Sequence, residues 1–413
     1  MALRDSFVIP MQTQPGVVPA KSTPNPSMPG YLFVLPWYPE STIGGVNQAV
    51  LHLVDRMSSD DRSRPFLLVL SDQDCPPSEP HLNCPAFSLA IRPPVNEGHP
   101  FRGPLAFLLT LPWTLLKLRR ILKERNIRTI NCIFPGIGNF SFVLLRRLGL
   151  YSGKVVLTLQ GNDIKLALDA TGWERTLVRW MFRRSDFVVG CSRGIQEDLL
   201  RLEPACSRNS VVIHNAVDID AFVAQIPPGF EVPEPLRGSR FLLNVGRYEH
   251  KKGQDVLIRA FEQIADVFPD LSLVMIGAPG TDIDTIRELV ARSPVSRRIF
   301  MIESVPHEHV PAYLKAALLF VLPSRREGLP FAILEAAACR KPVVAAAAVG
   351  VPELIEDRVT GRLVPVDDNN ALAEAISDLV AHHDLREQVA DNLHRLVSTE
   401  FTWRQAYEKY TSL

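Results

Sequence analysis

The segment that decides the fold is "LLFVLPSRREGLPFAILEAAACRKPVVA", residues 318–345. It begins with an apolar run of strand length, turns at Gly328 and Pro330, and continues as an apolar helix rich in small residues. A second apolar run follows at 341–348. This order of strand, helix and strand is typical of a parallel sheet covered by helices, so we predict an α/β protein.

The same segment carries two carboxylates, Glu327 and Glu335, with seven residues between them. A helix start presents unpaired N–H groups and partial positive charge, so the turn at Gly328 suits a phosphate. Glu335 lies about 12 Å further along the helix axis, so it would contact a different part of an extended ligand. The alternative is a buried structural carboxylate that pairs with a cation.

Strands alternate with helices in two separate regions. Apolar runs of strand length lie at 31–36, 66–71, 129–134, 154–160, 186–192 and 210–216, and then at 240–247, 271–277, 297–302, 318–324 and 341–348. We predict a disordered leader over 1–30 and two Rossmann-like domains that face each other across a cleft. The predicted ranges are 31–224 for the first domain, 225–239 for a Pro-rich linker, 240–398 for the second domain and 399–413 for a C-terminal helix that packs back on the first.

Bulk composition excludes several classes of protein. The 413 residues include 45 basic and 45 acidic side chains, which gives no electrostatic case for nucleic acid as a partner. The spacing of the six cysteines matches no metal-binding motif. The simplest interpretation is that they are reduced thiols in a cytosolic protein. We find no signal peptide and no apolar run that reaches the roughly 18 residues of a membrane span. We predict a cytoplasmic protein, with the inner face of the cytoplasmic membrane as a further expectation.

Two more loops after strands carry notable residues. In "NVGRYEHKKGQD" (244–255) a strand ends at Gly246, and the cations of Arg247 and Lys252 follow. Two such cations can neutralise a diphosphate, whereas Lys251 is more simply a surface charge. In "WYPESTIGGVNQAV" (37–50), Gly44 and Gly45 precede a helix and either expose backbone amides to an anion or sugar or form a flexible turn.

Together these loops resemble glycosyltransferase family 4, the nucleotide-sugar enzymes of the GT-B fold. The resemblance runs from about Tyr31 onward and is densest over 241–364. The quoted loops carry it together with "LVMIGAPG" (273–280) and "GVPELIEDRVTGRLVPVDD" (350–368). It implies a retaining hexosyltransferase that takes a nucleotide-diphosphate sugar as its donor.

The resemblance also implies residue roles. Arg247 and Lys252 would hold the leaving diphosphate, Glu327 would contact donor-sugar hydroxyls, and Glu335 would bind the ribose. These first three residues are the expected catalytic set. The expected donor-binding set is Gly44, Gly45, Gly246, Gly328, Leu329, Pro330 and Glu335.

Several residues depart from the family pattern. Gln160 stands where histidine is common, and it can hydrogen-bond a sugar but cannot shuttle a proton. Asn162 and Asp163 are therefore further candidates for acceptor or sugar contacts. Arg340 replaces the usual glycine after the helix, which weakens the expected C-cap. His214 is interpreted as a loop histidine.

No carboxylate is convincingly placed as a nucleophile in the first domain, so we expect front-face substitution without a covalent intermediate. The paired aspartates at 218 and 220, and at 282 and 284, and the "HEH" at 307–309 lack further ligands. We therefore expect no metal and no other cofactor, with the nucleotide sugar as substrate.

The stretch at 101–128 is apolar early and basic late, with Pro112 interrupting it. It is either an amphipathic element on an anionic membrane or a core helix with a solvated basic tail. The leading function is sugar transfer to a glycan or a polyprenyl-linked acceptor in surface or extracellular polysaccharide synthesis. A GT-B epimerase or hydrolase and a non-catalytic nucleotide-sugar-binding protein are the alternatives. No strand ends in GxGxxG, which argues against a NAD-dependent oxidoreductase.

Overall fold

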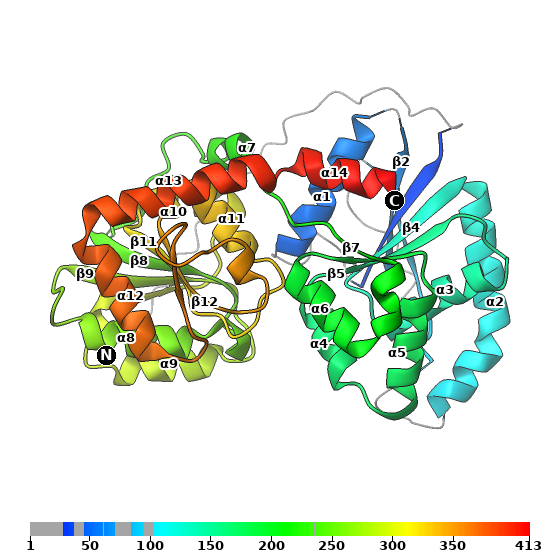
Figure 1. The fold of residues 1–413 in the computed structure, drawn as a ribbon, viewed down its shortest axis with the longest axis horizontal. Helices are drawn as coiled ribbons and strands as arrows, with labels where there is room; N and C mark the ends of the chain where they lie inside the picture. Colours follow the sequence, from blue (N-terminus) through cyan, green and yellow to red (C-terminus); the bar gives the residue numbers. More distant parts are fainter. Residues whose placement is uncertain (1–27, 37–44, 61, 71–83, 95–101, 235) are drawn as a thin grey trace, which may run out of the picture.

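The computed structural model describes residues 28–36, 45–60, 62–70, 84–94, 102–234 and 236–413. Most of the predicted leader, and Gly44 of the Gly-Gly loop, lie outside these residues. Figure 1 shows two α/β units side by side, with helices around each sheet.

The first unit is built on a parallel sheet of seven strands in the order β3-β2-β1-β4-β5-β6-β7. Its strands are β1 (Gly30–Leu35), β2 (Arg64–Leu70), β3 (Ala86–Leu89), β4 (Ile127–Ile133), β5 (Lys154–Leu159), β6 (Phe187–Gly190) and β7 (Ser210–Val212). The helices are α1 (Gly45–Ser58), α2 (Arg102–Glu124), α3 (Phe140–Arg147), α4 (Asn162–Asp169), α5 (Gly172–Arg184), α6 (Arg193–Leu202) and α7 (Ile219–Ala224). Strand β1 is buried along its whole length, as its apolar sequence predicts.

The second unit has a parallel sheet of six strands in the order β10-β9-β8-β11-β12-β13. Its strands are β8 (Arg240–Val245), β9 (Leu271–Ile276), β10 (Ile299–Ile302), β11 (Leu319–Leu322), β12 (Val343–Ala346) and β13 (Arg362–Val364). The helices are α8 (Gln254–Ile264), α9 (Ile283–Arg292), α10 (Val310–Ala316), α11 (Phe331–Ala338), α12 (Asn369–Ala381) and α13 (His383–Glu400). The last helix of the chain is α14 (Trp403–Ser412).

The strand order reverses at one strand of each sheet. Strand β8 lies between β9 and β11, and β1 lies between β2 and β4. In open parallel sheets, ligands bind beyond the carboxyl ends of the strands at such a switch point. The loops after β1, β8 and β11 are the three that the sequence marked as functional.

The predicted fold class is confirmed, and the strands that sequence missed lie at sheet edges. Strands β3 and β13 have four and three residues, and β3 is mostly half-buried. Such short edge strands lack the continuous apolar run that marks the central strands.

Helix α2 runs through Pro112 without a break, as the core-helix alternative for 101–128 requires. Pro112 and Leu108, whose carbonyl loses its usual hydrogen bond, both lie on the exposed side of the helix. Water can therefore satisfy that carbonyl. On the opposite side Phe107, Leu115 and Leu118 pack into the core, so α2 covers the sheet.

Helix α14 links the end of the chain to the first unit. In Figure 1, α13 crosses the second unit and α14 continues beside α1. The Trp403 ring stacks on His52 with centroids 5.2 Å apart, and the Tyr407 hydroxyl donates to Asp60 at 2.7 Å. These contacts hold the C-terminal helix on the first unit.

Arg340 follows Cys339, the C-cap of α11, and takes the backbone conformation that usually needs glycine at this position. Its φ is 52°, in the left-handed region that favours glycine, and its N–H donates to the Ala337 carbonyl. We expect Arg340→Gly to raise the free energy of unfolding by about 1 kcal/mol, and the thermal midpoint by roughly 2–4 °C. Arg340→Ala keeps the strain and removes only the exposed ion pair with Asp391, so it is the matched control. If both variants shift the midpoint equally, backbone strain is not the cause.

Candidate functional site

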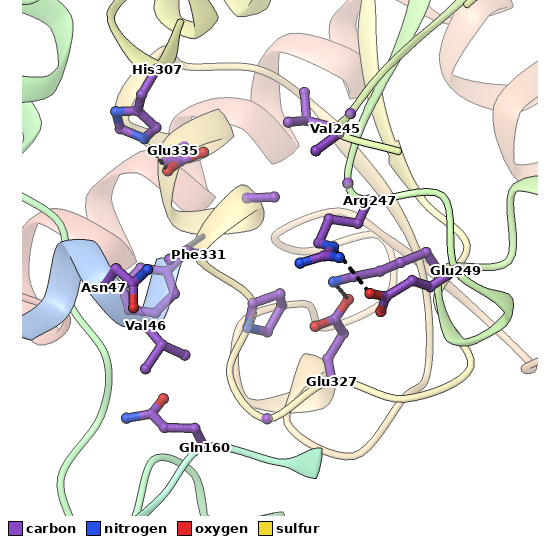
Figure 2. A pocket seen from close by; sticks show the side chains of 18 of the residues that line it. Val46, Asn47, Gln160, Val245, Arg247, Glu249, His307, Glu327, Phe331 and Glu335 are labelled. Carbon is purple, nitrogen blue, oxygen red and sulfur yellow. Dashed lines mark hydrogen bonds and ion pairs between the residues drawn. The ribbon is translucent and has the colours of Figure 1, made fainter. Parts of the chain in front are cut away.

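A cavity of about 430 Å³ lies between the two units, where the switch points face each other. Figure 2 shows side chains that line it from both sides: Val46, Asn47 and Gln160 from the first unit, and Arg247, Glu327 and Glu335 from the second.

Most of the predicted site residues meet in this cavity. The lining includes Gly45, Gln160, Asn162, Gly246, Arg247, Lys252, Glu327, Gly328, Leu329, Pro330 and Glu335. Residues that the sequence analysis did not assign to a ligand also line it, among them Asn47, Phe134, Asn215, Glu249, His307 and Phe331.

Asp163 is the exception, because its carboxylate faces its own turn. It accepts hydrogen bonds from the backbone N–H groups of Gln160, Gly161 and Ile164 at 2.7–3.1 Å, and it is buried. Burial raises its pKa to about 6, although the backbone donors act in the opposite direction. The structure thus places the Asp163 carboxylate outside the cavity lining, where it orders the loop that presents Gln160 and Asn162.

Gln160 is held in place by a residue of another loop. Asn215, which follows β7, donates to the Gln160 side-chain oxygen at 3.2 Å and to the Leu329 carbonyl at 3.1 Å. One buried amide thus connects the loop after β5 with the turn before α11. This leaves the Gln160 amide N–H₂ available as a hydrogen-bond donor in the cavity.

The two predicted diphosphate cations each pair with a carboxylate. Lys252 Nζ lies 2.8 Å from Glu327 Oε1, and Arg247 Nε lies 3.1 Å from Glu249 Oε1 (Figure 2). Lys252 ends a short 3₁₀ turn, and Gly253 follows at φ 67°, a conformation that glycine adopts without strain. A diphosphate that binds these cations would compete with both carboxylates. Glu327 therefore neutralises Lys252 in this structure, in addition to the contact with a sugar that we expect of it.

Gly45 is explained by close packing between the units. A Cβ atom there would come within 2.8 Å of the Phe331 Cβ, too close for two carbon atoms. Phe331 is the first residue of α11, and Pro330 is its N-cap. The glycine therefore lets the start of α1 approach the start of α11.

The sequence left two roles open for Glu335, contact with a ligand and pairing with a cation, and its position in the structure is compatible with both. It lines the cavity, and its Oε1 lies 3.1 Å from Nε2 of His307, which belongs to the loop after β10. The hydrogen bond to Glu335 raises the pKa of His307, while burial acts against the shift. The Phe222 ring packs edge-on against His307 at 5.6 Å. The imidazole thus fixes the orientation of the carboxylate.

The raised pKa of His307 predicts a pH-dependent contribution to stability. Protonated His307 is favoured in the folded state, so its contribution is complete below the unfolded pKa of 6.5. The contribution is lost as the pH rises through the raised folded value. We expect His307→Gln to lower the thermal midpoint by several degrees at pH 5.5 and by less at pH 8.5. An equal loss at both pH values, or the same pattern in the exposed control His383→Gln, would contradict this.

Among the described residues, no group of three or more His, Cys, Asp or Glu side chains is arranged to hold a metal ion. Asp218 instead caps α7, where its side chain accepts from the Ala221 N–H at 3.0 Å. His214 pairs with Glu353 at 2.9 Å, in agreement with its interpretation as a loop histidine.

Two family models match consecutive parts of the chain. The model "Glycosyltransferase Family 4" matches residues 43–221, and "Glycosyl transferases group 1" matches residues 230–395. The chain belongs to glycosyltransferase family 4. The family resemblance inferred from the loops is thereby confirmed, and this family 4 chain is a glycosyltransferase, not an oxidoreductase.

Curated relatives of the family 4 chain are glycosyltransferases of different specificity. A GDP-mannose-dependent phosphatidylinositol monomannoside mannosyltransferase of Mycolicibacterium smegmatis is 28% identical over 68% of the chain and 74% of its own length. A D-inositol 3-phosphate glycosyltransferase of Xylanimonas cellulosilytica is 31% identical over 54% of the chain. An alpha-maltose-1-phosphate synthase of M. smegmatis is 32% identical over 57% of it. The matched regions span 55% and 63% of the latter two relatives.

Solved structures confirm the GT-B arrangement. A sucrose-phosphate synthase from Thermosynechococcus elongatus superposes with a TM-score of 0.74 at 20% identity, covering 93% of the chain and 98% of that structure. Anabaena HepE in complex with UDP and glucose superposes with a TM-score of 0.71 at 18% identity, with the same coverage. At these identities the likeness shows the fold.

Proposed function

We propose that this glycosyltransferase moves a sugar from a nucleotide-diphosphate donor to a glycan or lipid-linked oligosaccharide acceptor, with retention of anomeric configuration. The observation that carries the proposal is the convergence of Arg247, Lys252 and the start of α11 on one interdomain cavity. Two cations and a helix start suit a leaving diphosphate, while Glu327 and Glu335 suit the sugar and the ribose.

Front-face substitution fits the residues on the acceptor side. The first unit contributes Gly45, Val46, Asn47, Phe134, Gln160, Asn162 and Asn215 to the described lining, and none of these is a carboxylate. A double displacement needs a nucleophile there. We therefore propose that the bond from the anomeric carbon to the diphosphate breaks while the acceptor oxygen attacks from the same side. A diphosphate oxygen takes the acceptor's proton, and Arg247 and Lys252 stabilise the departing charge.

The relatives support a nucleotide sugar and leave its identity open. The mannosyltransferase relative is named for GDP-mannose and for a phosphatidylinositol glycolipid, and HepE was solved with UDP and glucose. These names favour a donor with a nucleoside diphosphate and an acceptor carried on a lipid. We place the reaction in surface or extracellular polysaccharide synthesis, at the inner face of the cytoplasmic membrane.

The test is incubation of the full chain with radiolabelled UDP-, GDP- and ADP-sugars, with and without a membrane extract. The expected result is label in the lipid fraction. With an α-linked donor, the transferred sugar is expected to be α-linked in the product. Free monosaccharide or an epimerised donor would support the hydrolase or epimerase alternative instead. Binding of donor without any turnover would support a non-catalytic role.

We also propose that transfer needs no divalent metal, because the two cations and the helix start supply the positive charge that a metal would. Initial rates in excess EDTA are expected to stay within about twofold of the untreated rate. Loss of activity with EDTA, and its return with magnesium, would refute this.

A further inference from the structure

Helix α2 has an inner face that the core uses and an outer face that no described element covers. The inner face packs Phe107, Leu115, Leu118 and Leu122 into the first unit. The outer face exposes large apolar side chains, with exposed fractions of 60% for Leu105, 62% for Leu108, 67% for Leu109, 75% for Trp113 and 54% for Leu116. These five are half of the ten exposed large apolar residues found in the described chain, so the exposure is concentrated on one helix.

The spacing places these side chains on one stripe. Leu105, Leu109, Pro112 and Leu116 follow one another at intervals of three or four residues, which lie on the same side of a helix. The apolar part runs from residue 105 to 116, roughly 17 Å along the axis. A helix with such an apolar stripe can lie in the plane of the membrane interface with the stripe inserted. The stripe also carries Trp113, and tryptophan is enriched at membrane interfaces.

Positive charge follows directly on the same stripe. The last two turns of α2 expose Lys117, Arg119, Arg120 and Lys123, and the helix contains a single acidic residue, Glu124, which pairs with Arg120 at 2.7 Å. The chain as a whole has no net charge, so this excess of cations is local. An apolar stripe that continues into cations is complementary to an anionic lipid surface. The same stripe on a second copy offers these cations no acidic residue besides Glu124, which already pairs with Arg120.

The first half of α2 packs against the start of α3. Phe107 contacts Phe140 at a ring distance of 6.1 Å, and Phe140 begins α3 just after the carboxyl end of β4. The same loop carries Phe134, which lines the cavity. A bilayer that contacts α2 therefore lies against the first unit, and Figure 1 shows α2 on the side of that unit that faces away from the second. No helix among the described residues is long and apolar enough to cross a membrane.

We propose that the outer stripe of α2, Leu105 to Lys123, is a docking surface for a bilayer of anionic lipids. The part of the proposal that concerns lipid-carried acceptors rests on the function proposed above. Docking of the stripe holds the first unit, which lines the acceptor side of the cavity, on the membrane that carries such an acceptor.

The test is co-sedimentation of the full chain with vesicles of phosphatidylcholine alone or mixed equally with phosphatidylglycerol. We expect binding to the mixed vesicles that weakens at high salt. Trp113→Gln with Leu109→Gln is expected to lower the partition coefficient at least tenfold. Arg119→Gln with Lys123→Gln is expected to lower it about fivefold per charge on mixed vesicles only. Val267→Ser and Arg297→Gln, at exposed positions of the second unit, are matched controls.

Binding unaffected by both α2 variants, or no binding of the wild type, would overturn the proposal. A dimer in light scattering that the Trp113 and Leu109 changes dissociate would overturn it in favour of self-association. Circular dichroism checks that the variants are folded, and the salt dependence of the wild type needs no variant. Because sedimentation does not require turnover, docking can fail while transfer to a water-soluble acceptor persists. If the chain binds the vesicles but transfers no sugar, only the proposed function is rejected.

Discussion

Lys252→Ala is expected to lower the turnover number by a factor of about 100 to 1000 while donor binding weakens much less. The Lys252 ammonium lies in the cavity beside Arg247, where negative charge grows on the leaving diphosphate. Removal of one fixed donor to developing charge typically costs this factor in an enclosed site. The interaction strengthens as the bond breaks, so the loss falls mainly on the turnover number.

The variant also leaves Glu327 without its cation. The Glu327 side chain is only 11% exposed, and loss of Lys252 removes a 2.8 Å ion pair. Some loss of stability is therefore expected, and Lys252→Ala with Glu327→Gln restores a neutral pair. Lys315→Ala, at an exposed position of α10, is the matched control for removing a lysine. If the double variant recovers the wild-type rate, Lys252 serves only to neutralise Glu327, and its assignment to the diphosphate is refuted.

The fold could be predicted because its central strands are long and apolar. Strands such as β1 and β8 are buried on both faces, and each is followed by a turn that the sequence marks with glycine or proline. Edge strand β13 has only three residues and was missed, since half-buried edges need no apolar run. Pro112 left a core helix and an interfacial element open as alternatives, because its exposure could not be known from the sequence.

The lining of the cavity could be predicted from the sequence only in part. Arg247, Lys252 and Glu327 are charged residues in loops that join a buried strand to a helix, where ligands of parallel sheets bind. Asn215 and His307 come from loops whose sequence gives no comparable sign, and only the fold brings them to the cavity. His307 was considered solely as a metal ligand, because the distance to Glu335 depends on how β10 and β11 are placed.

Asp163 shows why a polar residue beside a glycine is ambiguous. A carboxylate there can face a ligand, or it can accept the N–H groups of its own turn. The sequence offered one sign of the second role: Asp163 lies three residues after Gln160, the spacing at which aspartate caps a turn. The buried carboxylate with four short backbone contacts shows that this role prevails.

Gly328→Ala is expected to lower kcat/KM by about 100-fold, for a reason that the sequence did not reveal. The sequence favoured Gly328 as a point of close approach to phosphate. In the structure, an added Cβ would instead lie within 2.8 Å of both the Gln160 carbonyl carbon and the Cys191 sulfur, which belong to the first unit. Two backbones from different units therefore meet at this glycine, and a methyl group would separate them by roughly 1 Å.

Such a separation acts on catalysis through geometry. The first unit supplies Gln160 and Asn162 to the cavity, and the second supplies the cations, so a shift of one unit moves the acceptor side away from the leaving group. A displacement of about 1 Å can cost 100-fold in rate. The added methyl group faces the Gln160 backbone, so donor affinity measured by calorimetry is expected to change much less than turnover. Gly136→Ala adds the same methyl group where nothing lies within 4 Å, and it is expected to be neutral. Wild-type turnover in Gly328→Ala would mean that the units need not close at this point for the reaction to proceed.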